Sequence, residues 1–259
     1  MTLKAQLKAA QRANAEGADP RVVRALSQAD AALSKSGILD RCKRAGDFMP
    51  DFTLPDAKGR RVALSRLRSR GPVVVSFYRG DWCEYCALEL SALAVIYKNI
   101  REMGASLVAI SPQAPDDWVR ADDLLNLPFP LLWDSKANVA RQCGLTYTVP
   151  AVLRPIYSGA GLRPHGGAEE GWRLPLPATY VVDGTGKIVL SWLDTDYTSR
   201  LEPGEIVTML SHMQRQTALQ SSSIAVSPAQ ATKGPQLDEG PSSRGKTTHK
   251  RRLPARRSL

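Results

Sequence analysis

The sequence predicts an α/β domain with a central sheet flanked by helices, preceded by a helical extension and followed by a basic tail. Between residues 72 and 143, short apolar runs alternate with segments of helical periodicity, which is typical of a sheet with parallel strands. Hydrophobic residues make up 43% of the 259 residues, enough to form a packed core. After residue 217, Ser, Pro, Gly, Gln and basic residues dominate, and this composition cannot bury enough surface to offset chain entropy.

The first 45 residues are expected to form two charged, amphipathic helices rich in Ala and Leu. Asp19-Pro20 separates them, and its proline suits the first turn of the second helix. No chemistry is evident in this extension. We expect a packing arm or a contact within a homodimer.

The predicted domain covers residues 46–217, and residues 218–259 are predicted to be a disordered tail. The domain is expected to begin with a turn-rich segment, residues 46–55, followed by a hairpin turn at 56–59. Its expected elements are strand 73–78, helix 83–103, strand 106–111, helix 115–126, strand 130–133, helix 135–143, strands 179–183 and 187–193, and helix 203–217. Residues 145–176 are rich in Gly and Pro and are expected to form an irregular insertion over one sheet edge.

The net charge of +10 is unevenly distributed. Residues 220–259 hold eight Lys and Arg against two Asp and Glu, a net charge of +6. The basic balance therefore describes mainly the tail, and a solvated extension is favoured over a specific nucleic-acid partner. No run approaches the roughly 18 apolar residues that a membrane span needs, and the first 23 residues lack the apolar stretch of a signal peptide. We expect a soluble, cytoplasmic protein.

Candidate chemistry is concentrated in Cys83-Glu84-Tyr85-Cys86, between an apolar strand and a helix start. Thiols there lie among unpaired N–H groups at the positive end of a helix dipole, which stabilises the thiolate that attacks peroxides and disulfides. Cys42 and Cys143 are far apart in sequence, which disfavours a zinc site, and both are expected to be inert. Asp81 is expected to be a solvated turn carboxylate. No metal or cofactor is expected, because cysteines carry the electrons.

Several segments resemble the peroxiredoxin (AhpC/TSA) family of the thioredoxin fold, over roughly residues 46–215. They are Gly46–Pro55, the strand leading into Cys-x-x-Cys, and Pro177–Asp183. The subgroup with Cys-x-x-Cys in its active-site loop is the most similar, on Phe77–Cys86 and Asp196–Pro203. The resemblance implies a thioredoxin-like fold with a mixed central sheet.

Peroxiredoxins carry Pro-x-x-x-Thr-x-x-Cys, in which the cysteine attacks the peroxide. Aligned without gaps, this pattern places Arg79 on the proline, Cys83 on the threonine and Cys86 on the peroxidatic cysteine. The arginine that the family has before a late strand falls at or near Pro177. Cys83 and Pro177 match thioredoxins instead, and the resemblance implies that Pro177 is a cis-proline packed against the dithiol.

The resemblance implies a thiol-dependent peroxidase. Cys86 would attack the peroxide to give a sulfenic acid, Cys83 would condense with it, and thioredoxin or a similar dithiol would reduce the disulfide. Arg79 or Arg200 would have to replace the missing arginine. Trp82 beside the dithiol also resembles thioredoxin, so one alternative is a disulfide oxidoreductase in which Cys83 attacks first. A second alternative is a non-catalytic redox sensor or binding module.

Overall fold

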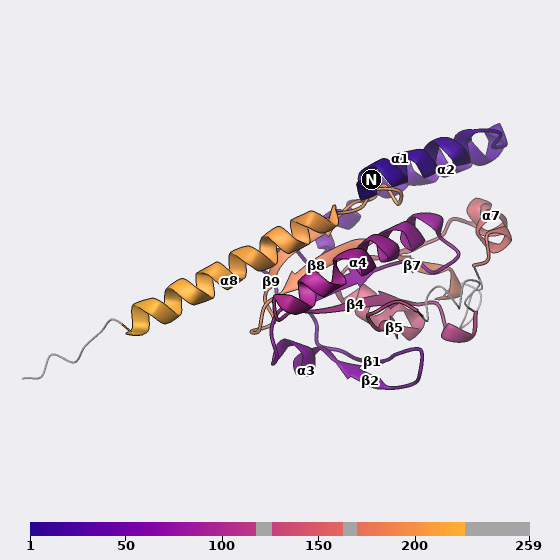
Figure 1. Cartoon of the computed structure of the whole chain (residues 1–259). Helices are drawn as coiled ribbons and strands as arrows, with labels where there is room; N and C mark the ends of the chain where they lie inside the picture. Colours follow the sequence, from indigo (N-terminus) through magenta and orange to yellow (C-terminus); the bar gives the residue numbers. More distant parts are fainter. Residues whose placement is uncertain (118–125, 163–169, 226–259) are drawn as a thin grey trace, which may run out of the picture. The chain divides into compact units, whose positions relative to one another are not determined.

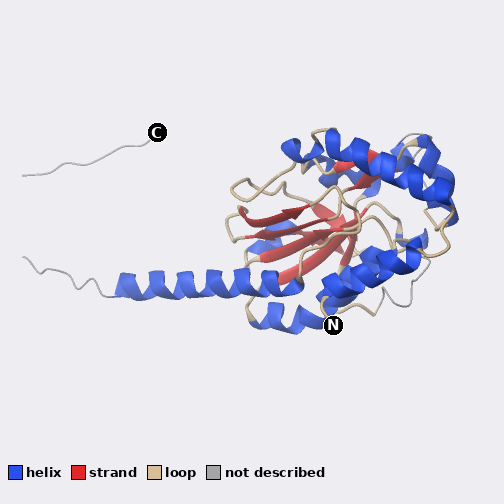
Figure 2. Cartoon of the chain, turned by 90° about the horizontal axis from the view of Figure 1, so that it is seen from above, coloured by secondary structure: helices blue, strands red, loops and turns tan. Residues whose placement is uncertain are grey.

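A five-stranded sheet forms the centre of the computed structural model, which describes residues 1–117, 126–162 and 170–225. In the order β5-β4-β3-β8-β9, its strands are Leu131–Trp133, Ser106–Ser111, Val73–Phe77, Ala178–Val182 and Ile188–Leu193. Strand β4 is parallel to β3 and β5, whereas β8 is antiparallel to β3 and β9. The sheet is therefore mixed, as predicted, and Figure 2 shows it flanked by helices.

Helices cover both faces of this sheet (Figure 1). Because side chains alternate along a strand, Val74 joins one apolar cluster while Val73 and Val75 join the other. Helices that contribute to the first cluster include α1 (Leu3–Ala15), α4 (Glu84–Glu102) and α8 (Pro203–Ala225). Those that contribute to the second are η1 (Ile38–Arg41), α3 (Leu64–Arg68) and α6 (Asn138–Gln142).

The N-terminal extension forms the two predicted helices, α1 and α2 (Pro20–Lys35). Asp19 caps α2 by accepting a hydrogen bond from the backbone N–H of Arg21, and Pro20 opens the helix. Leu3 and Leu7 of α1 are buried in the same cluster as α4. The extension is thus packed on the domain, and the domain boundary at residue 46 stays a prediction.

The segment 145–176, predicted to be irregular, contains regular structure. Strand β6 (Thr146–Thr148) pairs antiparallel with β7 (Arg173–Pro175), and α7 (Arg154–Gly159) lies between them in sequence. The paired segments are far apart in the chain, so the local pattern of Gly and Pro does not reveal them. Residues 163–169 lie outside the described part. The predicted hairpin is present as β1 (Thr53–Pro55) and β2 (Arg61–Ala63).

Two predicted helices differ from the structure. Of the helix expected at 115–126, the structure describes a turn at Pro115–Asp117, and 118–125 lie outside the described residues. The helix expected at 135–143 is interrupted, because Lys136 and Ala137 have φ angles of 61° and 53°. Only α6 remains helical there, since a left-handed residue breaks the run of helical dihedral angles.

The last helix is longer than predicted, since α8 continues to Ala225. The predicted end of this helix at 217 is therefore eight residues too early, and the start of the tail at 218 stays a prediction. Lack of apolar residues prevents a core but not a helix: Ala, Leu and Gln have high helix propensity, and elongation from the packed part of α8 avoids the cost of nucleation. Residues 226–259 of the predicted tail lie outside the described part of the chain.

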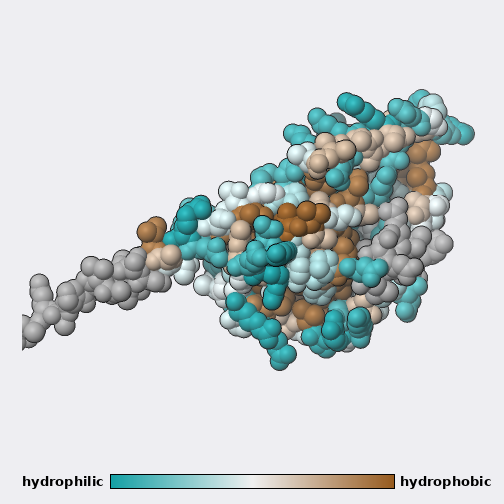
Figure 3. Space-filling view, viewed as in Figure 1, coloured by the Kyte–Doolittle hydropathy of each residue, from teal (hydrophilic) through white to brown (hydrophobic). Residues whose placement is uncertain are grey.

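Hydrophilic side chains cover much of the face seen in Figure 3, with smaller hydrophobic patches between them. Among the helices of the described segments, none is long and apolar enough to cross a membrane.

Candidate active site

The predicted dithiol lies where β3 meets α4. Cys83 is the N-cap residue of α4 and Cys86 is in its first turn, where the backbone N–H of Cys86 donates to the Cys83 carbonyl at 3.0 Å. Both sulfurs are therefore at the positive end of the helix dipole, as predicted. Only 4% of Cys83 and 0% of Cys86 is exposed. Cys83 and Cys86 are not joined by a disulfide bond in this structure.

Each sulfur accepts a hydrogen bond from its own arginine. Arg79 Nη2 lies 3.2 Å from Cys83 Sγ, and Arg200 Nη2 lies 3.2 Å from Cys86 Sγ. Both arginines are buried. Arg79 precedes α4 in the active-site loop, whereas Arg200 comes from the segment between β9 and α8. The two candidate replacements for the family's arginine are thus both in the site, one for each sulfur.

Arg200 is held by a buried carboxylate that the sequence analysis missed. Its Nε pairs with Oε2 of Glu89, while Glu89 Oε1 accepts hydrogen bonds from Ser76 Oγ at 3.2 Å and Thr179 Oγ1 at 3.4 Å. Glu89 therefore balances the charge of Arg200 and fixes its orientation. The signal was available, since Glu89 lies three residues after Cys86 and shares its helical face.

Arg79, by contrast, is surrounded by aromatic side chains. Its guanidinium lies 4.4 Å from the ring centre of Tyr197, 5.0 Å from Trp82 and 5.4 Å from Tyr157, and its Nη1 donates to the Tyr157 hydroxyl at 3.1 Å. No carboxylate of the described residues pairs with it. Arg79 Nε and Trp82 Nε1 are buried donors without a hydrogen-bond partner in the described structure. Such donors are costly unless an acceptor binds them.

The surroundings shift the pKa values of the two thiols in opposite directions. Burial raises the pKa of Cys83, but a hydrogen bond with Cys86 and the charges of Arg79 and Arg200 outweigh it, so that the pKa lies well below its usual range. Burial and the neighbouring Cys83 raise the pKa of Cys86 well above its usual range. The charges of the site agree with a lower pKa for Cys83 than for Cys86. Glu89 neutralises Arg200, whereas the thiolate of Cys83 neutralises Arg79.

The loop before Cys83 is fixed from a neighbouring strand. Asp81 is 1% exposed, its backbone N–H donates to Gln113 Oε1 at 2.8 Å, and its Oδ1 accepts from Gln113 Nε2 at 2.7 Å. The expectation that Asp81 is a solvated carboxylate is therefore wrong. The sequence did not reveal its partner, because Gln113 follows β4 and is distant from Asp81 in the chain. A Cβ on Gly80 would lie 2.3 Å from Trp82 Nε1, so only glycine allows the indole to pack there.

Pro177 directly precedes β8, whose Ala178 pairs with Phe77. Its peptide bond is trans, so the expected cis-proline is absent at this position. Trans is the intrinsically favoured form of an X–Pro bond. Pro177 lines a cavity with Tyr147 and Tyr197.

The other two cysteines lie in the cluster on the opposite face of the sheet, as expected of packing residues. Burial raises the pKa of Cys143 to about 12 and also raises the pKa of Cys42. Neither is therefore a thiolate at neutral pH. In the described residues, no group of three or more His, Cys, Asp or Glu side chains is arranged to hold a metal ion.

Comparison with known proteins connects this geometry to a family. A Mycobacterium tuberculosis protein provisionally named a peroxiredoxin is 33% identical over 113 residues, 44% of this chain and 73% of that protein. The thiol-disulfide oxidoreductase ResA of Bacillus subtilis is 28% identical over 171 residues, 62% of this chain and 77% of that protein. The fold is similar to the solved structure of a peroxiredoxin 6 mutant of Arenicola marina, with a TM-score of 0.51, 16% identity, and coverage of 66% of this chain and 74% of that one. The AhpC/TSA family model matches residues 45–191, more than half of the sequence, and the chain therefore belongs to the AhpC/TSA family.

Proposed function

We propose that this protein is a thiol-dependent peroxidase that reduces hydrogen peroxide or organic hydroperoxides with Cys83 and Cys86. Family membership supports the reaction class. The observation that carries the proposal is the pairing of each buried sulfur with a buried arginine at 3.2 Å. A guanidinium can stabilise both a thiolate and the charge that develops on the oxygens of a breaking O–O bond.

In the proposed first step, the Cys83 thiolate attacks the terminal oxygen of the peroxide. An S–O bond forms, the O–O bond breaks, and the departing oxygen takes the proton held by Cys86, leaving as water or an alcohol. Arg79 stabilises the developing charge, and its unpartnered Nε offers a further hydrogen bond to a peroxide oxygen. The products of this step are a sulfenic acid on Cys83 and a thiolate on Cys86.

In the second step, the Cys86 thiolate attacks the sulfenic sulfur. The S–S bond forms and hydroxide leaves, taking a proton from solvent to become water. Arg200 stabilises Cys86 in this step as Arg79 stabilised Cys83 in the first, which gives each arginine a role. Thioredoxin or a similar dithiol then supplies two electrons to restore the reduced pair.

The alignment with peroxiredoxins predicts the opposite order, with Cys86 attacking first. We favour Cys83 because its pKa is lowered whereas that of Cys86 is raised. The test is the rate of oxidation by hydrogen peroxide, followed by Trp82 fluorescence in stopped flow. If Cys83 attacks first, Cys86→Ser reacts rapidly and accumulates a sulfenic acid that a dione reagent traps, whereas Cys83→Ser does not. The reverse pattern would assign the attack to Cys86, and a wild-type rate equal to that of a free thiolate would reject the peroxidase.

A disulfide oxidoreductase is the second candidate, which the similarity to ResA favours. The burial of both sulfurs argues against it, because a protein disulfide is too bulky to reach them in this conformation, whereas a peroxide is small. A redox sensor would become oxidised once per molecule without turnover in the presence of a dithiol. The cytoplasmic location and the homodimer stay predictions.

A further inference from the structure

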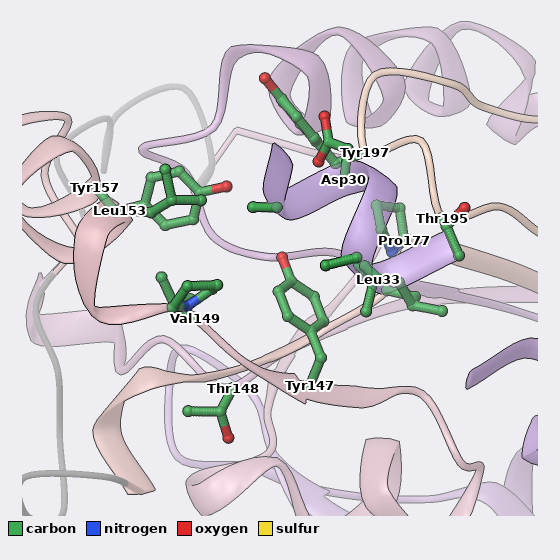
Figure 4. Close-up of a pocket in the computed structure, with 14 residues that line it drawn as sticks. Asp30, Leu33, Tyr147, Thr148, Val149, Leu153, Tyr157, Pro177, Thr195 and Tyr197 are labelled. Carbon is green, nitrogen blue, oxygen red and sulfur yellow. The ribbon is translucent and has the colours of Figure 1, made fainter. Parts of the chain in front are cut away.

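A cavity of about 200 Å³ lies behind the aromatic residues that surround Arg79. Helix α2 forms one side of it, and the segment from β6 to α7 forms another. Figure 4 shows the ring of Tyr147 projecting into the space between Tyr157 on one side and Leu33 and Pro177 on the other. Because α2 precedes the residues matched by the family model, this wall is an addition of this chain to the family's domain.

Most of the cavity is apolar. The apolar lining residues include Ala29, Leu33, Val149, Leu153, Leu176 and Pro177. An apolar protein cavity of about 150 Å³ is large enough to bind benzene. The volume therefore suits a branched alkyl or aryl group and exceeds what hydrogen peroxide requires.

The polar groups of the cavity connect it to the dithiol. Tyr157 lines the cavity and accepts a hydrogen bond from Arg79 Nη1, and Arg79 Nη2 donates to Cys83 Sγ. A phenol oxygen that accepts from a guanidinium retains its own O–H for donation. A ligand with one polar end would thus direct that end toward Arg79 and leave its apolar part in the cavity.

Asp30 of α2 lies beside the ring of Tyr197 at another side of the cavity (Figure 4). Burial, reinforced by Asp196, raises the pKa of Asp30 to about 6, so the carboxyl is mostly charged at neutral pH. A negative charge at this position repels anionic ligands. The cavity therefore favours an uncharged organic group.

We propose that this cavity binds the organic group of an uncharged alkyl or aryl hydroperoxide and that α2 thereby sets the peroxide preference of the enzyme. The inference rests on the proposed peroxidase function. The hydroperoxide end lies toward Arg79, the O–O bond is cleaved as described above, and the alcohol product retains the organic group.

The test uses Ala29→Leu, which fills the cavity from α2, and Ala31→Leu, which makes the same change at an exposed position of the same helix. The measurement is the second-order rate constant for oxidation of the reduced full chain by cumene hydroperoxide and by hydrogen peroxide. One methylene in an apolar pocket changes the discrimination between two substrates at least about tenfold. Ala29→Leu should therefore lower the ratio of the rate constant for cumene hydroperoxide to that for hydrogen peroxide by about tenfold or more. Ala31→Leu should leave the ratio unchanged.

A second variant protects the test against a folding defect in the first. Leu33→Ala enlarges the cavity. For a hydroperoxide bulkier than cumene hydroperoxide, it should raise the ratio of that compound's rate constant to the rate constant for hydrogen peroxide. If hydrogen peroxide oxidises the wild type rapidly but neither cavity variant changes the ratio, the cavity assignment is wrong and the peroxidase stands. If the wild type reacts slowly with both peroxides, the proposed function itself fails.

Discussion

Replacing Arg79 with glutamine should raise the pKa of the Cys83 thiol and slow its oxidation. Arg79 donates to Cys83 Sγ at 3.2 Å in a buried site, and no carboxylate of the described residues forms an ion pair with it. A buried hydrogen bond to a charged group contributes roughly 1.5–3 kcal/mol. Since one pKa unit corresponds to about 1.4 kcal/mol, the pKa should rise by about one to two units in Arg79→Gln.

The direction of the pKa change follows from the protonation state of Cys83 that Arg79 stabilises. Arg79 favours the thiolate, so the pKa of Cys83 in the folded protein lies below its ordinary value, and the oxidation rate falls as the pH drops through that pKa. In Arg79→Gln this fall should move to higher pH by about one to two units, and at pH values below the wild-type pKa of Cys83 the rate should drop by about 10- to 100-fold, in proportion to the thiolate lost.

The assay is the pH dependence of oxidation by hydrogen peroxide, combined with titration of the thiolate by ultraviolet absorbance. Arg101→Gln is the matched control, because it removes an exposed arginine from α4 and should alter neither curve. An unchanged thiolate pKa in Arg79→Gln would refute the assignment of Arg79 as the counterion of Cys83. A normal pKa with a slow reaction would instead limit Arg79 to the stabilisation of the leaving oxygen.

Three further variants probe the surroundings of the dithiol. Glu89→Gln leaves Arg200 without its counterion, so the pKa of Cys86 should fall, and denaturant unfolding should show a loss approaching the 3–5 kcal/mol or so typical of a broken buried ion pair. Gly80→Ala introduces a Cβ that meets the indole of Trp82 at 2.3 Å, and it should cost about 1–3 kcal/mol of stability and slow oxidation. Gly204→Ala is the control, because a Cβ there has nothing within 4 Å, and it should have neither effect. Equal effects of the two variants would contradict the packing argument. Cys143→Ala should leave the oxidation rate unchanged, and a slower first step would show that this thiol takes part in the reaction after all.

Elements with continuous local signals could be predicted from the sequence. Strand β4 has the predicted bounds, and α4 begins and ends within one residue of prediction, because apolar runs, an N-terminal dithiol and Gly104 are consecutive features of the chain. The site was predictable to the same extent, since Cys83 and Cys86 are held together by one turn of a helix.

What could not be predicted depends on contacts between distant segments. Asp81 is buried because Gln113 follows a neighbouring strand, and Arg200 reaches Cys86 because the chain returns to the site after β9. Glu89 shares the helical face of Cys86, but the sequence does not show that it would pair with Arg200 and accept hydrogen bonds from two strands. The trans bond before Pro177 likewise depends on how the whole loop packs, and the thioredoxin resemblance predicted it incorrectly.

Asn14, in helix α1 of the N-terminal extension, forms hydrogen bonds with Glu84 and Tyr85, the two residues between the cysteines. Its Nδ2 donates to Glu84 Oε2 at 2.8 Å and to the Tyr85 hydroxyl at 3.2 Å. A peroxide can diffuse to the sulfurs past this arm, but a protein reductant must contact the disulfide directly. The two halves of the catalytic cycle therefore differ in their dependence on arm motion.

We expect the reductive half of the proposed cycle, and not the oxidative half, to require opening of this contact. Under steady peroxide supply, most molecules should rest as the disulfide, and turnover should reach a ceiling set by how often the arm opens rather than by reductant concentration. Asn14→Ala should raise that ceiling without accelerating the peroxide step.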